Sequence, residues 1–190
     1  AAGGASDGMK LAINIAAMLL AFVALIAMIN SVIGWVGDWH AAGYQSLNMM
    51  LNEGAAAGAT PVKLNLGLIL GYILAPVAWA IGIEWDDAVI AGGLIGQKVV
   101  LNEFIAYLQL SQTPVGTGAG QISENTRLIL TYALCGFANF ASIAIQIGGI
   151  GGLAPERRSD LARFGLRAVL GGSIATLMTA TIAGVLIHLR

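Results

Sequence analysis

Hydrophobic runs that contain no Asp, Glu, Lys or Arg divide this chain into segments. The first run, residues 11–37, is 27 residues long. A helix rises about 1.5 Å per residue, so a run of this length can cross a bilayer with some tilt. The pattern predicts a spanning helix, with Ser6 or Asp7 capping its start. Residues 38–63 are rich in polar and turn-forming residues and are expected to form a connection outside the hydrocarbon.

The second uncharged run, residues 64–83, is interrupted by Pro76. Proline removes a backbone donor and disfavours helix at the preceding residue, so the run can be a kinked spanning helix or a helix at the membrane surface. We favour an interfacial helix over residues 64–85. In that arrangement Lys10 lies on the same side of the membrane as the arginine-rich loop near residue 160, as the positive-inside rule requires.

Residues 86–122 carry two hydrophobic stretches that are each too short to cross a bilayer. Between them lie Lys98, Asn102 and Glu103, within the motif GQKVVLNEFIAY. Two half-length helices that meet at polar residues indicate a re-entrant helical hairpin, followed here by a loop. Irregular backbone at membrane depth is tolerated only where protein buries it or water lines it, and transporters place substrate sites at such breaks.

Residues 123–190 are predicted to form two more spanning helices. The first contains Asn139 and Ser142, whose spacing of three would place them on one face of a continuous helix. The loop that follows holds four arginines and is expected on the cytoplasmic side. Small residues recur at every fourth position of the last helix and favour close helix packing; they are Gly171, Ala175, Thr179 and Ala183.

The composition agrees with an all-α polytopic membrane protein. The chain is 57% hydrophobic and 10% charged, with a mean hydropathy of +0.81, whereas a soluble domain carries about 25% charged residues. A net charge of −1 gives no electrostatic reason to expect nucleic acid as a partner. The single cysteine, Cys135, excludes an internal disulfide and a paired-thiolate metal site, and we expect it to be a small buried hydrophobe. His40 and His188 join no cluster with ligand spacing, so neither a metal site nor another cofactor is predicted.

Glu103 is the strongest candidate for a binding residue. An acid in hydrocarbon costs at least roughly 2.5–3.5 kcal/mol and is usually retained because it has a function. The alternative is an ion pair with Lys98 that only holds the hairpin together. Asn139 and Ser142 can bind a ligand or supply hydrogen bonds between helices. Asn102 can bind a ligand or cap a half-helix at the hairpin tip.

Three stretches together resemble the concentrative nucleoside transporters: GQKVVLNEFIAY, CGFANFASIAIQIGGIGG and LAPERRSDLARFGLRA. The resemblance covers nearly the whole chain and corresponds to the C-terminal half of that family, so we expect the chain to be part of a longer protein. It departs from the family at Ala141, where a serine is usual, but retains the neighbouring Ser142.

The resemblance implies an architecture and a site. Residues 1–63 would belong to a scaffold that forms a homotrimer, and the hairpin and residues 123–190 to a mobile transport domain whose first helix is broken near residues 137–142. The ribose of a nucleoside would contact Glu103, Phe137, Asn139 and Ser142, with Asn102 as a further candidate. The base contacts and the ligands of the coupling cation, Na⁺ or H⁺, would lie mainly outside this chain.

We therefore predict cation-coupled nucleoside symport across a bacterial inner membrane. The first alternative is a membrane-embedded enzyme that uses Glu103 as an acid or base, but the sequence shows no nucleophile–base pair or metal cluster beside it. The second alternative is a channel-like subunit, which would pass solute without accumulating it.

Overall fold

The computed structural model describes residues 2–39, 45–51, 63–118 and 120–189. These residues are mostly helical and contain no β-strand, only an isolated bridge between Val115 and Ile122. The chain divides into two compact units, residues 1–66 and 67–190. The predicted all-α membrane architecture is confirmed.

The first unit consists of α1 (Ala2–Asp38), α2 (Leu47–Leu51) and their connections. The predicted spanning run lies inside α1, which is 37 residues long. The predicted cap is wrong, because Ser6 and Asp7 are within the helix and not at its start. Alanine is the strongest helix former, and Ala2 and Ala5 extend the helix beyond the point where the hydrophobic pattern begins.

Two asparagine side chains, one from α1 and one from α2, bond the residues at the start of α3 (Leu66–Ala80). Asn48 donates from Nδ2 to Asp38 Oδ1 at 2.8 Å and accepts at Oδ1 from the Leu64 backbone N–H at 2.8 Å. Asn30 accepts at Oδ1 from the backbone N–H of Leu66 at 2.9 Å. The first N–H groups of a helix lack partners within the helix, so Asn30 supplies one from a different helix.

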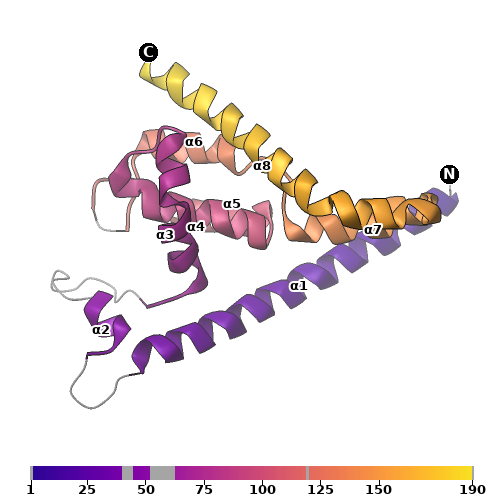
Figure 1. Ribbon diagram of the computed structural model, residues 1–190, viewed down its shortest axis with the longest axis horizontal. Coiled ribbons are helices and arrows are strands. Elements are labelled where there is room, and N and C mark those ends of the chain that lie inside the picture. The colour runs from indigo at the N-terminus through magenta and orange to yellow at the C-terminus, as the bar shows by residue number, and fades with distance from the viewer. Residues whose placement is uncertain (1, 40–44, 52–62, 119, 190) are drawn as a thin grey trace. The chain divides into compact units, whose positions relative to one another are not determined.

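The second unit contains the remaining helices (Figure 1). They are α3 (Leu66–Ala80), α4 (Trp85–Val100), α5 (Glu103–Gln112), α6 (Glu124–Ala133), α7 (Phe140–Leu153), the 3₁₀ turn η1 (Pro155–Arg157) and α8 (Arg158–His188). α3 continues through Pro76 without interruption. The polar break in the hairpin lies at residues 101–102, between α4 and α5, and a second break, residues 134–139, separates α6 from α7. The second break begins three residues before the range 137–142 that the resemblance implied.

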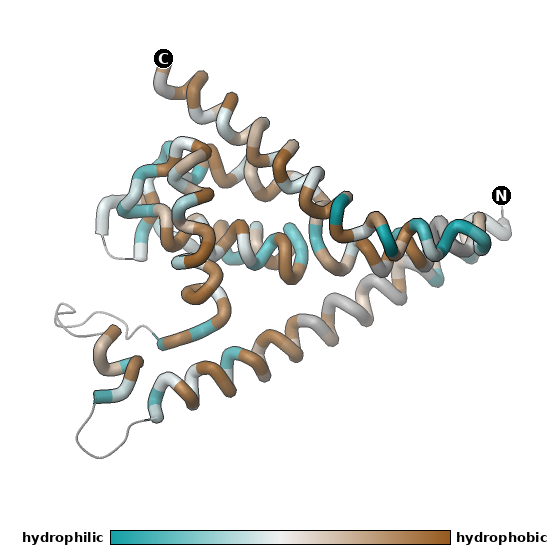
Figure 2. The backbone as a smooth tube through the Cα atoms, viewed as in Figure 1, coloured by the Kyte–Doolittle hydropathy of each residue, from teal (hydrophilic) through white to brown (hydrophobic). Residues whose placement is uncertain are grey.

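Length and composition identify which helices can cross a bilayer. Among the described residues, the helix Pro155–Ile187 is long and hydrophobic enough to do so. α3 and α4 pass the same test only as a pair, and they are bent by 115° relative to each other. Figure 2 shows that α8 is hydrophilic near its arginine-rich beginning and largely hydrophobic afterwards, as expected for a helix that leaves an aqueous loop and enters hydrocarbon.

α3 and α4 pack with their backbones in direct contact. A Cβ added to Gly92 would lie 2.7 Å from the Gly71 carbonyl oxygen and 2.8 Å from the Ala75 nitrogen. A Cβ added to Gly93 would lie 2.8 Å from the carbonyl oxygen of Gly67. Small residues allow such an approach between membrane helices, so these glycines attach α3 closely to the hairpin helix α4.

We expect Gly92→Ala to destabilise the protein, because the atoms that its new methyl group would meet belong to the backbone and cannot rotate away. Overpacking of this kind costs about 1–3 kcal/mol. Gly171→Ala in α8 is the matched control, since no atom lies within 4 Å of the position of its added Cβ. Thermal unfolding of the purified proteins measures the difference. A Gly92→Ala protein as stable as the control would contradict the close packing of α3 and α4.

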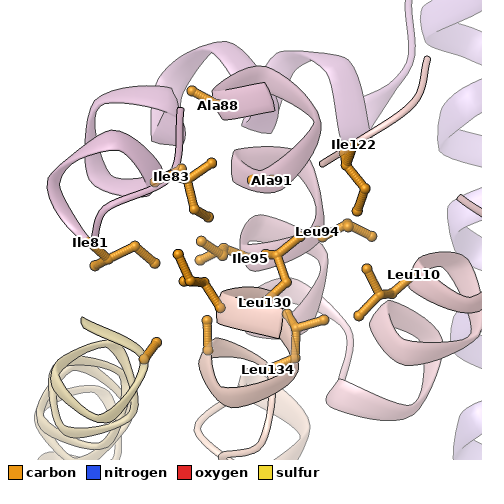
Figure 3. Packing of buried hydrophobic residues seen from close by; sticks show 14 of the residues in the cluster. Ile81, Ile83, Ala88, Ala91, Leu94, Ile95, Leu110, Ile122, Leu130 and Leu134 are labelled. Atoms are coloured by element: carbon orange, nitrogen blue, oxygen red, sulfur yellow. The ribbon is translucent and has the colours of Figure 1, made fainter. Parts of the chain in front are cut away.

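A hydrophobic cluster connects the hairpin to α6 and α8 (Figure 3). It is built from residues of α3, the α3–α4 turn, α4, α5, the α5–α6 loop, α6 and α8, among them Ile81, Ile83, Leu94, Ile95, Leu110, Ile122, Leu130, Leu134 and Ala180. Because these side chains are almost fully removed from solvent, the cluster holds the hairpin break close to the break between α6 and α7.

The face of α8 that packs against the hydrophobic cluster is offset by one residue from the small-residue face that the sequence predicted, which begins at Gly171. Ala180 is fully buried, a Cβ on Gly184 would lie 3.1 Å from Ile129, and a Cβ on Gly172 would lie 3.1 Å from Ala138. Gly171, by contrast, faces open space. Both faces of α8 carry small residues every fourth position, so the periodicity alone could not select between them.

Candidate functional site

The two helix breaks bring a carboxylate and an amide into contact. Glu103 is the first residue of α5, immediately after the hairpin break. Asn139 is the last residue before α7 and is 2% exposed. Its Nδ2 donates a hydrogen bond to Glu103 Oε2 at 2.9 Å, although the two residues are 36 positions apart in the chain. The structure thus joins two of the predicted site residues directly.

Ser142 belongs to the same network. The Oδ1 atom of Asn139 accepts from the Ser142 backbone N–H at 2.7 Å, as in a helix N-cap. The Ser142 hydroxyl lies 2.8 Å from Asn139 Oδ1 and 2.5 Å from the Phe137 carbonyl oxygen. A hydroxyl has one hydrogen to donate and can rotate, so Ser142 can exchange one of these contacts for a ligand.

Asn102 occupies the corresponding position at the start of α5. Its Oδ1 accepts from the Ile105 backbone N–H at 3.0 Å, which is the capping role weighed from the sequence. The side chain is 5% exposed, and its Nδ2 has no hydrogen-bond partner among the described residues. A buried donor without a partner costs about 1–3 kcal/mol, so capping does not account for the whole side chain.

The position of Glu103 explains how a carboxylate is tolerated at membrane depth. It begins α5 and contacts Asn139, which caps α7, so it lies at the N-terminal ends of two half-helices. The N-terminal end of a helix carries a partial positive charge. Broken helices in transporters direct such ends at anionic groups, and here they favour the acid of the protein itself.

Phe137 lies beside this network, with its side chain largely exposed at 73%. Together with Ser142 it lines a cavity of about 580 Å³ between α7 and α8. Gln146 also lines this cavity, and the sequence analysis did not name it. It follows Ser142 by four residues, so the helical spacing could have indicated that both side chains lie on one face. The cavity continues toward Arg157 and Asp160, which form an ion pair at 2.6 Å.

Three further residues near the hairpin tip differ from expectation or were overlooked. Lys98 is 1% exposed but makes no ion pair with Glu103. Cys135 is exposed, so the prediction of a buried thiol is wrong. Tyr107 donates from its hydroxyl to the Thr131 carbonyl oxygen at 2.5 Å and thereby links α5 to α6. Cys135 lies in the non-helical stretch 134–139, and the length of the hydrophobic run did not indicate this break.

Comparison with known proteins identifies the family to which this architecture belongs. A family model described as "Na+ dependent nucleoside transporter C-terminus" matches residues 1–184. The chain belongs to this nucleoside transporter family. The resemblance inferred from the three motifs is confirmed. Because the family consists of transporters, the interpretation of Glu103 as the acid or base of a membrane-embedded enzyme is set aside.

Relatives of known sequence cover this chain almost completely. An uncharacterized transporter, YutK of Bacillus subtilis (strain 168), is 48% identical over 98% of the chain. The nucleoside permease NupC of Helicobacter pylori is 44% identical over 100% of the chain, and sodium/nucleoside cotransporter 1 of Mus musculus is 39% identical over 98%. The chain spans 40%, 41% and 27% of the lengths of these three relatives, respectively.

Solved structures of the transporter CNTnw are similar in fold as well as in sequence. The inward-facing substrate-bound state matches with a TM-score of 0.79 at 46% identity, covering 100% of this chain and 41% of CNTnw. A double variant of CNTnw in an outward-facing state matches with a TM-score of 0.78 at 46% identity, covering 100% of this chain and 40% of that protein.

Proposed function

We propose that this chain forms the ribose-binding side of a cation-coupled nucleoside symporter. The observation that carries the proposal is the hydrogen-bonded network of Glu103, Asn139 and Ser142 at the junction of two helix breaks. Phe137 and Asn102 flank this network. Membrane transporters with broken helices bind substrate at such junctions.

The chemistry of the network suits a sugar with neighbouring hydroxyl groups. Asn139 uses one oxygen of the Glu103 carboxylate, and the other oxygen, Oε1, accepts no hydrogen bond from the described residues. A carboxylate can accept from two adjacent hydroxyls, and charge-assisted bonds are roughly twice as strong as neutral ones. The Ser142 hydroxyl can accept from, or donate to, the same sugar. A ribose supplies donors and acceptors at this spacing.

Sodium is the proposed coupling ion, and a proton is the alternative. The description of the family names Na⁺, and so does the name of the Mus musculus relative. Among the residues that the structure describes, no group of three or more His, Cys, Asp or Glu could hold a metal ion. We propose, as the resemblance to the family implies, that the cation ligands lie mainly in the part of the transporter that this chain does not represent.

We also propose that the hairpin and residues 123–190 move relative to a scaffold that includes α1. CNTnw has been solved in inward-facing and outward-facing states, as alternating access requires. By the same resemblance, the transporter is a homotrimer. The high identity to bacterial relatives supports a bacterial inner membrane.

Uptake of labelled uridine into proteoliposomes tests the function, with this chain expressed as the C-terminal part of a full-length transporter of the family. An inward sodium gradient is expected to accumulate unchanged uridine above its external concentration. A proton gradient that drives the same accumulation without sodium would assign the coupling to H⁺. Equilibration without accumulation under either gradient would indicate a channel and contradict symport.

A further inference from the structure

The break between α6 and α7 packs on α8 through alternate residues. A Cβ added to Gly136 would overlap the hydroxyl oxygen of Thr176 and would lie 3.2 Å from its Cγ2. A Cβ added to Gly172 would lie 3.1 Å from the Ala138 side chain. Gly136 and Ala138 are half-buried, whereas Phe137 between them is exposed. The contact positions on α8 are four residues apart and therefore lie on one face of that helix.

The helices on both sides of the break also contact α8. A Cβ added to Gly184 would lie 3.1 Å from Ile129 of α6, and a Cβ added to Gly165 would lie 2.6 Å from Ile143 of α7. Residue numbers rise along the broken helix as they fall along α8, so the two run antiparallel. Figure 1 shows α8 passing α6 and α7 without interruption. One continuous helix thus holds α6, the break and α7 in a fixed register.

Thr176 is a stiff part of this contact. Its hydroxyl donates to the Gly172 carbonyl oxygen at 2.6 Å, one helical turn earlier. Threonine branches at Cβ and has few side-chain rotamers in a helix. The hydroxyl therefore cannot turn away from Gly136 without losing its hydrogen bond, and residue 136 has no room for a side chain.

The break that α8 holds in this way carries part of the candidate site. Asn139 donates to Glu103 at 2.9 Å, and the Phe137 carbonyl oxygen accepts from Ser142. The groups of a binding site must be held within about 0.5 Å of their working positions. Residues 134–139 have no continuous helical hydrogen bonds to fix them to that tolerance, so their packing on α8 must supply the constraint.

We propose that Thr176 and Gly172 are positioning residues for substrate binding. They contact the break from the side of α8 and fix where Phe137 and Asn139 lie, without touching the substrate themselves. The inference rests on the proposed function, because its main readout is the affinity for a nucleoside.

Steric complementation between Gly136 and Thr176 tests the proposal in the full-length transporter. The overlap in Gly136→Ala is relieved by a shift on the order of 1 Å, and a misplacement of that size can reduce the activity of a positioned site about 100-fold. We expect the KM for uridine to rise about 10- to 100-fold. Adding Thr176→Ala leaves only the Cβ of residue 176, at 3.4 Å, so the KM should return to that of Thr176→Ala alone.

The split between KM and Vmax separates positioning from loss of folded protein. Fewer folded transporters would lower Vmax and leave the KM for uridine unchanged. Thr179→Ala is the matched control, because Thr179 also donates to a carbonyl oxygen four residues earlier, at 3.1 Å, but is exposed. Gly136→Ala combined with Thr179→Ala should keep the raised KM.

Alkylation of Cys135 gives a readout that does not depend on nucleoside transport. Cys135 is exposed and directly precedes Gly136. Its rate of reaction with N-ethylmaleimide, followed by mass spectrometry of the labelled peptide, should change in Gly136→Ala. The rate should return to that of Thr176→Ala when both substitutions are present. If the wild type carries no nucleoside, the proposed function fails, while the alkylation rates still test how α8 holds the break.

A second pair of residues serves if Gly136→Ala does not fold. Gly172→Ala requires a smaller displacement of the break, and Ala138→Gly should restore the KM that it raises. A wild-type KM in both Gly136→Ala and Gly172→Ala would show that α8 does not position the site. A raised KM, or a loss of folding, that neither paired substitution corrects would show that the contacts are not the cause. Either result overturns the proposal.

Discussion

Glu103→Gln is expected to reduce uridine uptake by about 100-fold. The substitution keeps the size of the side chain but removes its charge and replaces one acceptor oxygen with a donor. Hydrogen bonds to a charged group contribute about 1.5–3 kcal/mol each, and 1.4 kcal/mol corresponds to a factor of ten. Losing the charge assistance of two such bonds to neighbouring sugar hydroxyls accounts for the expected loss. Initial rates of labelled uridine uptake, at concentrations well below saturation, measure it.

Comparison of uridine with 2′-deoxyuridine makes this experiment specific for the sugar. The wild type should favour uridine, because a missing hydroxyl leaves a buried acceptor without a partner, and Glu103→Gln should lose most of that preference. Glu124→Gln is the control, since Glu124 is an exposed acid in the first turn of α6. Wild-type uptake by Glu103→Gln, or an unchanged preference for uridine, would refute the ribose assignment.

Two substitutions at Asn139 are expected to separate its two roles. Asn139 caps α7 through Oδ1 and bonds Glu103 through Nδ2. Asn139→Ala removes both interactions, so uptake should fall about 10- to 100-fold and the loss of the cap should cost about 1 kcal/mol of stability. Asn139→Ser keeps a capping oxygen but cannot reach Glu103. It should lose uptake to a similar extent while unfolding near the wild-type temperature.

The matched control for the cap is Ser123, which caps α6 by accepting from the Thr126 backbone N–H at 3.2 Å. Ser123→Ala should reduce the Tm by about 2–4 °C, as Asn139→Ala does, but should retain uptake. If Asn139→Ser transported normally, the bond to Glu103 would be a structural contact between helices and not part of the binding site.

Local chemistry made some of these features visible in the sequence. Lys98, Asn102 and Glu103 interrupt a hydrophobic stretch at a point where neither half can span, so the hairpin and its break could be predicted within a few residues. Asn139 and Ser142 also stood out, because polar side chains are costly in hydrocarbon and need a partner, but the residues alone left ligand binding and contacts between helices as equal alternatives. The motifs that contain these residues indicated the family.

Other features depend on contacts between residues far apart in the chain. Both faces of α8 have the same small-residue periodicity, and only packing against Ile129 and Ala138 selects one of them. The role of Asn30 as a partner for the Leu66 N–H arises from a contact across 36 positions. Cys135 is exposed and lies in the break after α6, which hydrophobicity does not indicate.

The sequence by itself determined the class of protein, the hydrophobic segments and the polar residues around which a site could be built, because the cost of placing charge in hydrocarbon acts on each residue alone. Only the tertiary structure decided that Asn139 would bond Glu103, that Asn102 would keep a donor without a partner, and that Lys98 would be buried without an ion pair. These outcomes depend on how two helix breaks, which lie 36 residues apart in the chain, are brought together in space. No local sequence pattern specifies that contact.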